Sequence, residues 1–218
     1  MKTIHALALA ALTGMAQAGT VYDNFQLTKW VVRVSPAVHV FEHAGRLRVD
    51  LNKGVKGEVS SGGYYSTCQL TGDFDVSTEF YLPEYPAANG VRVGLMLNTT
   101  QTNGVGFDTT YAAMQMVSLP DGTAQYAGDL SNYGYTLNAP ANTSNIQGKL
   151  RLKRAGQMLT AYFWDGPHGQ WVPVATSATF TAAPVYFGLT SWSQDSYFGD
   201  MRVRTAFDNP TIDGSCAN

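Results

Sequence analysis

The feature that most constrains this chain is an alternation of apolar and other residues, with a period of two, in many short segments. In segment 74–82, Phe, Val, Thr, Phe and Leu occupy every second position, and Asp, Ser, Glu and Tyr separate them. Successive side chains point to opposite faces of a β-strand, so this pattern predicts a strand with one buried face. The pattern also predicts strands in 92–98, 111–117, 149–153, 159–163, 185–189 and 201–212.

Turn signals separate these segments, and no long segment has a convincing helical period. Asn-Gly occurs at 89–90 and 103–104, and Gly-containing turns occur at 120–122, 155–156 and 165–167. Charged residues make up only 14% of the chain, and Gly occurs 22 times. Many short strands joined by turns predict an all-β sandwich or barrel. The polar stretch 137–147 is predicted to be a loop.

The N-terminus has the three parts of a secretory signal peptide in the right order. Lys2 precedes the apolar run 4–12, and Ala16-Gln17-Ala18 fits a small-x-small cleavage site. We therefore predict a signal peptide at 1–18, a single mature domain at 19–218 and secretion. The alternative is a buried N-terminal helix. No apolar run is long enough to span a bilayer.

Two cysteines, Cys68 and Cys216, lie in the predicted mature domain. In an oxidising compartment two cysteines usually form one disulfide, so we predict that these two are joined.

The balance of charge argues against a nucleic-acid partner. The net charge is −2, whereas binding to phosphates needs clustered Lys and Arg. Lys149, Arg151 and Lys153 alternate with Leu150 and Leu152, which predicts the solvent-exposed face of a strand.

Several segments, in this order, resemble the concanavalin A-like lectin and glucanase superfamily, particularly its laminarinase, lichenase and laminin-G-like domains. The resemblance covers nearly the whole mature chain. It implies a two-sheet antiparallel β-sandwich of the concanavalin A-like jelly-roll type, and leaves the oligomeric state open. The segments are 22–25 (YDNF), Trp30, 41–47 (FEHAGRL), 72–80 (GDFDVSTEF), 148–166 (GKLRLKRAGQMLTAYFWDG), 184–192 (PVYFGLTSW) and 204–212 (RTAFDNPTI).

The catalytic motif of the laminarinase family is missing from the segment that should carry it. The family places E-x-D-x-x-E on one strand, and the order of segments assigns that strand to 111–117 (YAAMQMV). Retaining hydrolysis needs two carboxyl groups about 5–5.5 Å apart. The fallback pair, Asp75 and Glu79, is four residues apart, or about 13 Å along a strand. We therefore predict no catalytic residue.

Glycan binding is the function that the resemblance favours. Trp192 follows the strand that, in the family, places a Trp in the concave sugar-binding groove; the alternative is a ring packed at a sheet edge. The other residues predicted to contribute to this face are Arg92, Asn98, Gln115, Tyr111 and Tyr126. The remaining Trp residues, Trp30, Trp164 and Trp171, are assigned to the core or to hairpin packing.

Calcium is the predicted cofactor. In glucanase relatives an Asp of the closing strand and backbone carbonyls hold a structural Ca²⁺, and Asp208 matches that Asp by position. Asp23 is a possible neighbour, although it matches no family ligand. The alternative is that Asp208 caps a strand turn.

These observations favour a secreted protein that binds an extracellular polysaccharide or other glycan. The second hypothesis is a glycoside hydrolase or polysaccharide lyase with a rearranged site, and the third is a structural matrix or surface protein. The concave face discriminates among them. Close carboxylates or a Tyr/His pair indicate an enzyme, aromatics with amides indicate a binding protein, and a flat apolar face indicates assembly.

Overall fold

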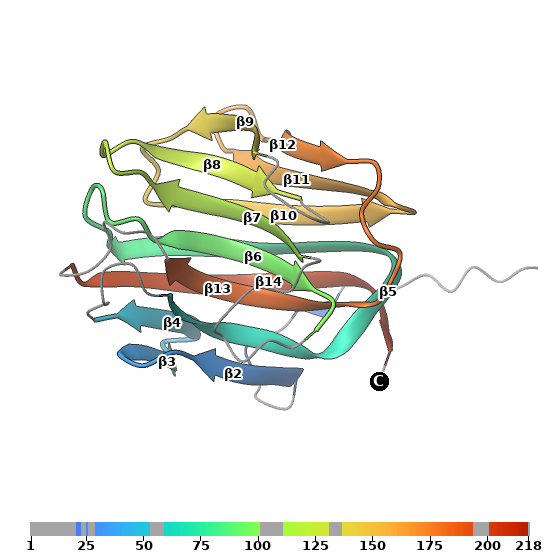
Figure 1. Cartoon of the computed structure of the whole chain (residues 1–218), viewed down its shortest axis with the longest axis horizontal. Helices are drawn as coiled ribbons and strands as arrows, with labels where there is room; N and C mark the ends of the chain where they lie inside the picture. Colours follow the sequence, from blue (N-terminus) through green and yellow to red (C-terminus); the bar gives the residue numbers. More distant parts are fainter. Residues whose placement is uncertain are drawn as a thin grey trace, which may run out of the picture.

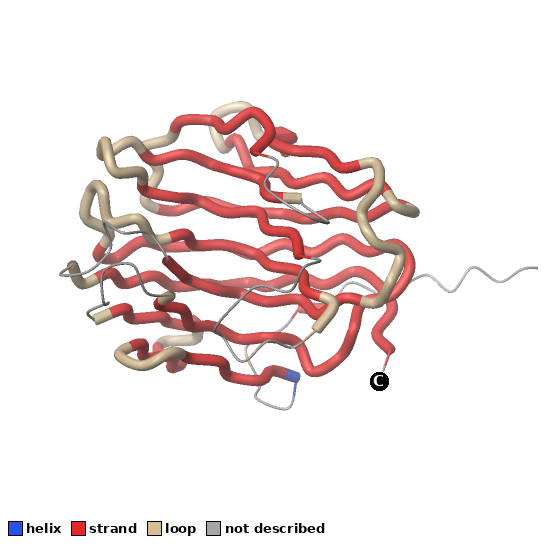
Figure 2. The backbone as a smooth tube through the Cα atoms, viewed as in Figure 1, coloured by secondary structure: helices blue, strands red, loops and turns tan. Residues whose placement is uncertain are grey.

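The computed structural model describes residues 21–22, 25, 29–52, 59–100, 111–130, 137–193 and 201–217. Most of them lie in strands (Figure 2), and none lies in an α-helix; Lys29, just before the strand at 30–34, is in a 3₁₀ turn. The described part of the chain accordingly holds no helix long and apolar enough to cross a membrane. The predicted signal peptide, 1–18, lies outside the described residues.

The strands form a sandwich of two antiparallel layers that share one long strand, β5 (Ser60–Glu84) (Figure 1). The front sheet consists, in spatial order, of β2 (Trp30–Val34), the first half of β5, β13 (Val185–Ser193), β6 (Arg92–Asn98), β7 (Tyr111–Ser118), β8 (Ala124–Asp129) and β9 (Leu137–Asn142). The back sheet consists of β3 (Val38–His43), β4 (Arg46–Leu51), β14 (Val203–Ala217), the second half of β5, β10 (Gln147–Ala155), β11 (Met158–Asp165) and β12 (Gln170–Ser177). The short strand β1 (Val21–Tyr22) pairs with β14.

The hydrophobic core lies between the layers and confirms the predicted strand faces. On β5, Val76 and Phe80 are fully buried, and on β6 and β13 Leu95 and Leu189 point into the same cluster. Trp30 also belongs to it, as predicted. The two-residue period therefore identified correctly which side of each of these strands is apolar.

Two predicted boundaries were wrong. The stretch 137–147 is not one loop, because β9 occupies its first six residues and pairs with β8. The sequence of β9 lacks β-branched residues and includes Pro140. A proline is tolerated there because β9 is the last strand in the order of the front sheet. The last strand continues beyond residue 212 to Ala217, where it pairs with β5. Pairing with a neighbouring backbone, rather than local composition, determines both strands.

The two layers are connected where β5 passes from one to the other. Leu70 is paired with Val185 of the front sheet and with Cys216 of the back sheet. Two residues later, Gly72 has φ +60°, a left-handed conformation that glycine adopts at no steric cost. The passage from sheet to sheet therefore takes place within residues 66–74.

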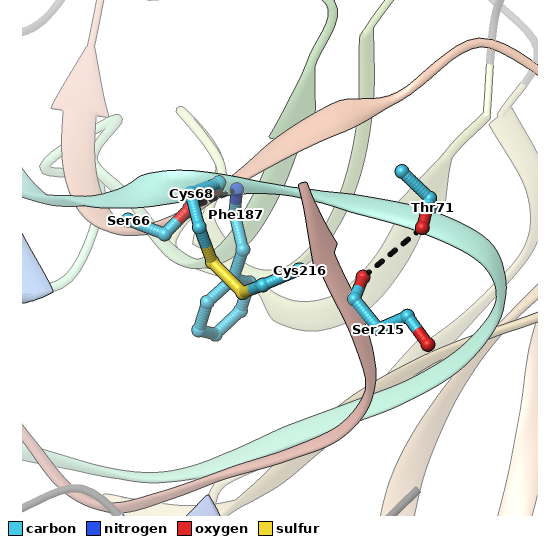
Figure 3. The surroundings of a disulfide bond; sticks show 6 residues. All are labelled: Ser66, Cys68, Thr71, Phe187, Ser215 and Cys216. Carbon is cyan, nitrogen blue, oxygen red and sulfur yellow. Dashed lines mark hydrogen bonds between the residues drawn. A yellow bond between two sulfur atoms is a disulfide. The ribbon is translucent and has the colours of Figure 1, made fainter. Parts of the chain in front are cut away.

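The predicted disulfide between Cys68 and Cys216 is present, and it closes this passage (Figure 3). The two Cα atoms are 5.5 Å apart, within the usual range for a disulfide. Beside it, Ser66 Oγ donates to the Cys68 carbonyl and accepts from the Phe187 N–H of β13. The bond therefore fixes the C-terminal end of β14 to the segment of β5 that both sheets share.

The buried side chain of Arg154, on β10, also ties this region together. Its Nε donates to the Gly72 carbonyl at 2.7 Å, and its Nη1 donates to the carbonyls of Thr181 and Ala183 at 3.2 and 2.9 Å. Its guanidinium carbon lies 4.5 Å from the ring centroid of Phe74. One side chain thus satisfies three carbonyls that belong to two distant segments.

We expect the Cys68→Ser, Cys216→Ser double variant to be destabilised by up to about 5 kcal/mol, because the disulfide closes a long loop in the unfolded chain. Denaturant unfolding of the oxidised wild type and of the variant measures the difference. Thiol labelling of the denatured, unreduced wild type should find no free thiol. Two free thiols per chain would contradict the disulfide.

We expect Arg154→Leu to lower the free energy of unfolding by about 2–5 kcal/mol, because it leaves buried carbonyls without donors. Arg154→Lys should be intermediate, since an ammonium cannot reproduce the planar fork of donors. The adjacent, exposed Lys153→Leu is the matched control and should change stability by less than about 0.5 kcal/mol. Equal stability of Arg154→Leu and the wild type would refute this role.

Candidate functional site

Five of the six residues predicted to bind a ligand share the outer face of the front sheet, the face turned away from the core. Strand pairing places them: Arg92 lies opposite Trp192, and Asn98 lies opposite Tyr111. Gln115 lies opposite Gly94, two residues from Arg92 on β6. The core-facing residues alternate with these, as predicted.

Tyr126, the sixth, was predicted wrongly. It pairs with the core-facing Met116, is 1% exposed and stacks on Phe163 with ring centroids 4.4 Å apart. Its hydroxyl accepts a hydrogen bond from Asn145 Nδ2 at 3.1 Å. The alternation of β8 turns residues 125, 127 and 129 outwards and residue 126 inwards, so this tyrosine is a core residue.

The same alternation places on the outer face a residue, Asp129, that the sequence analysis missed. Asp129 at the end of β8 lies on the outer face and is buried, and the Tyr111 hydroxyl donates to its Oδ2 at 2.6 Å. The signal was available, since polar Gln125 and Asp129 flank Ala127 at every second position. We refer to Asn98, Tyr111, Gln115 and Asp129 as the polar cluster.

The two amides of the polar cluster are buried without hydrogen bonds to other described residues. Asn98 is 1% exposed and Gln115 is 4% exposed. Neither Oδ1 nor Nδ2 of Asn98, nor Oε1 of Gln115, has a partner among the described residues. A buried polar group left unsatisfied costs about 1–3 kcal/mol, so such groups normally meet a ligand or an ordered water.

The polar cluster is elongated along β7. Tyr111, opposite Asn98, is four residues from Gln115, which corresponds to about 13 Å along the strand. The position facing Gln115 is Gly94, where a Cβ would lie only 2.1 Å from the Met114 carbonyl oxygen. No side chain other than hydrogen fits at residue 94, so β6 contributes no side chain at the position that pairs with Gln115.

An uncharged tyrosine, Tyr65, lies on the same outer face as the polar cluster. Tyr65 of β5 is buried and faces outwards beside Gly188 and Met96, and its hydroxyl donates to Met96 Sδ at 3.6 Å. Burial raises the pKa of Tyr65, while the charge of Arg33 lowers it by a smaller amount. Tyr65 therefore stays protonated and offers an apolar ring with one polar atom.

Trp192 occupies the predicted face, although its side chain is almost completely buried. It is 4% exposed, and the guanidinium carbon of Arg92 lies 4.6 Å from the ring centroid. It lies outside the core cluster and on β13, which is flanked by β5 and β6 and is not a sheet edge. The polar cluster, rather than this ring, is the centre of the site.

The fallback carboxylates lie on the opposite side of the sandwich. Asp75 and Glu79 point outwards from the back-sheet half of β5, where Arg151 holds Asp75 with two hydrogen bonds and Lys149 Nζ lies 2.6 Å from Glu79 Oε1. Burial alone would raise the pKa of Glu79, but hydrogen bonds from Lys149, Tyr81 and Asn209 lower it below its usual value. Both groups are committed to ion pairs.

The groups expected of an enzyme do not converge on the front face within the described part of the chain. Asp129 is the one carboxylate on that face among the described residues, whereas glycoside hydrolysis uses two. The described histidines, His39, His43 and His168, lie on β3 and in the turn after β11. None of these three can pair with a front-face tyrosine.

The surroundings of Asp208 do not resemble a calcium site. Its Oδ2 accepts from Arg46 Nε at 3.0 Å, and its Oδ1 accepts from the Asn209 N–H at 2.9 Å. No group of three or more His, Cys, Asp or Glu residues suited to a metal occurs among the described residues, and Asp23 lies outside them. Each oxygen of Asp208 thus already accepts a hydrogen bond, one of them from a positively charged side chain.

Comparison with known proteins identifies the fold. No protein-family model and no curated protein matches the sequence. Similar solved structures include LamAcat of Zobellia galactanivorans, with a TM-score of 0.62, 12% identity and coverage of 88% of this chain and 96% of that one. Another is a Lotus tetragonolobus seed lectin, with a TM-score of 0.63, 11% identity and coverage of 92% and 100%.

A third similar structure is the exoplasmic/lumenal domain of VIP36 in its Ca²⁺- and Man3GlcNAc-bound form. Its TM-score is 0.59 at 11% identity, and the match covers 91% of this chain and 89% of that one. All three are concanavalin A-like sandwiches. The predicted fold is therefore correct: the chain is a concanavalin A-like jelly roll, a fold shared by lectins and a glycoside hydrolase.

Calcium stays a prediction, and thermal unfolding tests it. If Ca²⁺ binds through Asp208, EDTA should lower the melting temperature of the wild type by mass action, and added Ca²⁺ should restore it. Asp208→Asn should then be insensitive to both. A melting temperature unchanged by EDTA in metal-stripped buffer would contradict the cofactor and leave Asp208 as the ion-pair partner of Arg46.

Proposed function

We propose that the protein binds a glycan on the outer face of the front sheet and does so outside the cell. The observation that carries the proposal is the pair of buried amides, Asn98 and Gln115, whose polar atoms lack partners among the described residues. A ligand rich in hydroxyl groups supplies both the donors and the acceptors that these amides need.

The chemistry of the polar cluster suits sugar hydroxyls. An amide offers one acceptor oxygen and two N–H donors, so it can bind neighbouring hydroxyls that each donate and accept. The Tyr111–Asp129 hydrogen bond holds an acceptor carboxylate in a fixed position beside them. Glycan sites generally combine such polar groups with apolar or aromatic surface, and Tyr65 and Met96 provide it here.

This arrangement favours binding over the two other hypotheses. Hydrolysis or elimination needs paired carboxylates or a Tyr/His pair, and the front-face residues that the structure describes provide neither. Assembly through this face would leave the Asn98 and Gln115 amides unsatisfied inside an interface unless the partner supplied hydrogen bonds, and unsatisfied buried polar groups are rare in stable interfaces. Both alternatives remain measurable outcomes of the experiment below.

An extracellular location agrees with two features of the chain. The segment 1–18 has the order of charge, apolar run and cleavage site that secretion uses. The Cys68–Cys216 disulfide is the kind of bond that persists in oxidising compartments. We therefore propose that the mature protein meets its glycan after export.

We expect Asn98→Leu with Gln115→Leu to weaken glycan binding at least tenfold, because it removes the amide hydrogen bonds. The same double variant should be as stable as the wild type or more stable, since the lost polar atoms had no partners among the described residues. A glycan array followed by affinity electrophoresis measures binding, and denaturant unfolding measures stability.

The exposed amide Gln157, in the turn between β10 and β11, provides the matched control. Gln157→Leu should leave both binding and stability unchanged. Unaltered binding by the double variant would refute the proposed site. Release of reducing sugars or unsaturated products by the wild type would replace binding with catalysis, and failure of the wild type to bind any glycan would favour assembly.

A further inference from the structure

A pocket lies on the opposite side of the sandwich from the polar cluster, on the outer face of the back sheet. Its volume is about 390 Å³, within the range of small-molecule sites. It is open to solvent and its floor is made by β5 and β10. The lining side chains include Glu79, Tyr81, Gln147, Lys149, Trp164 and Pro167.

The aromatic wall of this pocket is held rigidly. Trp164, near the end of β11, is partly exposed and makes an edge-to-face contact with Trp171 of β12, with ring centroids 5.3 Å apart. The predicted hairpin packing of these two rings is therefore confirmed. Trp171 in turn lies 5.3 Å from the guanidinium carbon of Arg151. Such contacts fix the indole of Trp164 without covering its pocket side.

The floor of the pocket consists of polar groups with fixed geometry. Lys149 Nζ lies 2.6 Å from Glu79 Oε1, and the Tyr81 hydroxyl and Asn209 Nδ2 donate to Glu79 Oε2 at 2.9 and 3.1 Å. Gln147 lies on the same face of β10 as Lys149. It is exposed and adds an amide group at the rim of the pocket. Donors and acceptors therefore surround the wall made by Trp164.

We propose that this pocket is a second carbohydrate-binding site, with Trp164 as the stacking platform and Glu79, Gln147 and Lys149 as the hydroxyl-binding groups. A flat indole beside convergent polar atoms matches the two surfaces of a pyranose, an apolar C–H face and a polar rim. The inference goes beyond the front-face proposal, because it concerns other residues on the other sheet and is tested independently.

The charges on the back face indicate a neutral glycan. The acidic side chains at the pocket and beside it are matched by basic neighbours: Glu79 with Lys149, Asp75 with Arg151 and Asp208 with Arg46. Paired charges at a surface leave little net field to attract a sulfated or uronic acid polymer. Hydrogen bonding to hydroxyls, in contrast, remains available to the same groups.

Two sites on opposite faces would let one protein molecule contact two segments of polysaccharide. A polymer presents many copies of the same epitope, so binding through both faces gains strength from effective concentration. A substitution that removes either site should therefore weaken binding to a polymer by a larger factor than it weakens binding to a short oligosaccharide.

The test uses affinity electrophoresis of the full mature chain in gels containing laminarin, a mannan, xyloglucan or a galactan, with carrageenan as the anionic probe. Four proteins are compared: the wild type, Trp164→Ala, the front-face double variant Asn98→Leu with Gln115→Leu, and the combination of all three substitutions. We expect Trp164→Ala to weaken binding to one of the neutral polymers at least tenfold, and the combination to abolish it.

Tyr162 is the matched control, because it lies two residues from Trp164 on the same face of β11, is also half-buried and does not line the pocket. Tyr162→Ala should change binding less than threefold. If circular dichroism shows that Trp164→Ala is unfolded, Trp164→Phe and the exposed Gln147→Ala replace it, and each should weaken binding measurably.

The two proposals fail in different ways. Unchanged binding by Trp164→Ala, or complete loss of binding in the front-face variant alone, would overturn the second site. Unchanged binding by the front-face variant, with loss in Trp164→Ala, would overturn the front-face proposal and leave the back pocket as the binding site. Binding of carrageenan but of none of the neutral polymers would overturn the choice of a neutral glycan, and binding of no polymer would overturn both sites.

Discussion

The rest of the structure depends on one strand, β5, that is hydrogen-bonded in both sheets. Its first half pairs with β2 and β13, and its second half pairs with β10 and β14. Even-numbered residues such as Tyr64, Leu70, Val76 and Phe80 face the core on both sides of the passage. A strand that keeps its parity while it changes sheets puts its odd-numbered residues on two opposite outer faces. Inserting one residue at the passage would reverse the faces of one half.

The passage is stabilised by interactions that a hydrophobic pattern does not contain. The Cys68–Cys216 bond joins it to the end of β14, and Arg154 supplies donors to the Gly72 carbonyl and to the segment that follows β12. The Arg154 hydrogen bonds satisfy backbone carbonyls at the passage, where a strand that leaves one ladder and enters another has unpaired positions. The disulfide and the Arg154 hydrogen bonds therefore lie at the place where the two outer faces acquire their relative orientation.

The sequence predicted the faces of most strands but not the contacts between them. Alternation correctly assigned Arg92, Asn98 and Gln115 to the outer face, because the period of two is a property of each strand alone. It placed Tyr126 wrongly, since segment 124–129 was not recognised as a strand and its parity was not considered. The Tyr111–Asp129 and Glu79–Lys149 pairs depend on the register between strands distant in sequence, and register is set by the whole fold. Calcium at Asp208 was inferred from position alone, and the sequence did not show that Arg46 reaches the same carboxylate.

The two outer faces differ in how much their polar residues lower the stability of the ligand-free protein. This difference bears on their proposed roles. The amides of Asn98 and Gln115 are buried, so they lose the hydrogen bonds to solvent that an exposed amide keeps, and they gain none from the described residues. Leucine at either position would avoid that loss without a large change in volume. Groups that reduce stability in this way are typical of functional sites, where local rules are broken because a ligand requires it. The pocket beside Trp164 carries no such penalty, because its polar groups are paired or solvated and its ring is only partly exposed. A site that costs little stability can be shallower and weaker than the front face, and it then strengthens the binding of a polymer through effective concentration. If both proposals hold, we expect the front face to be the principal site and the back pocket to be the auxiliary one.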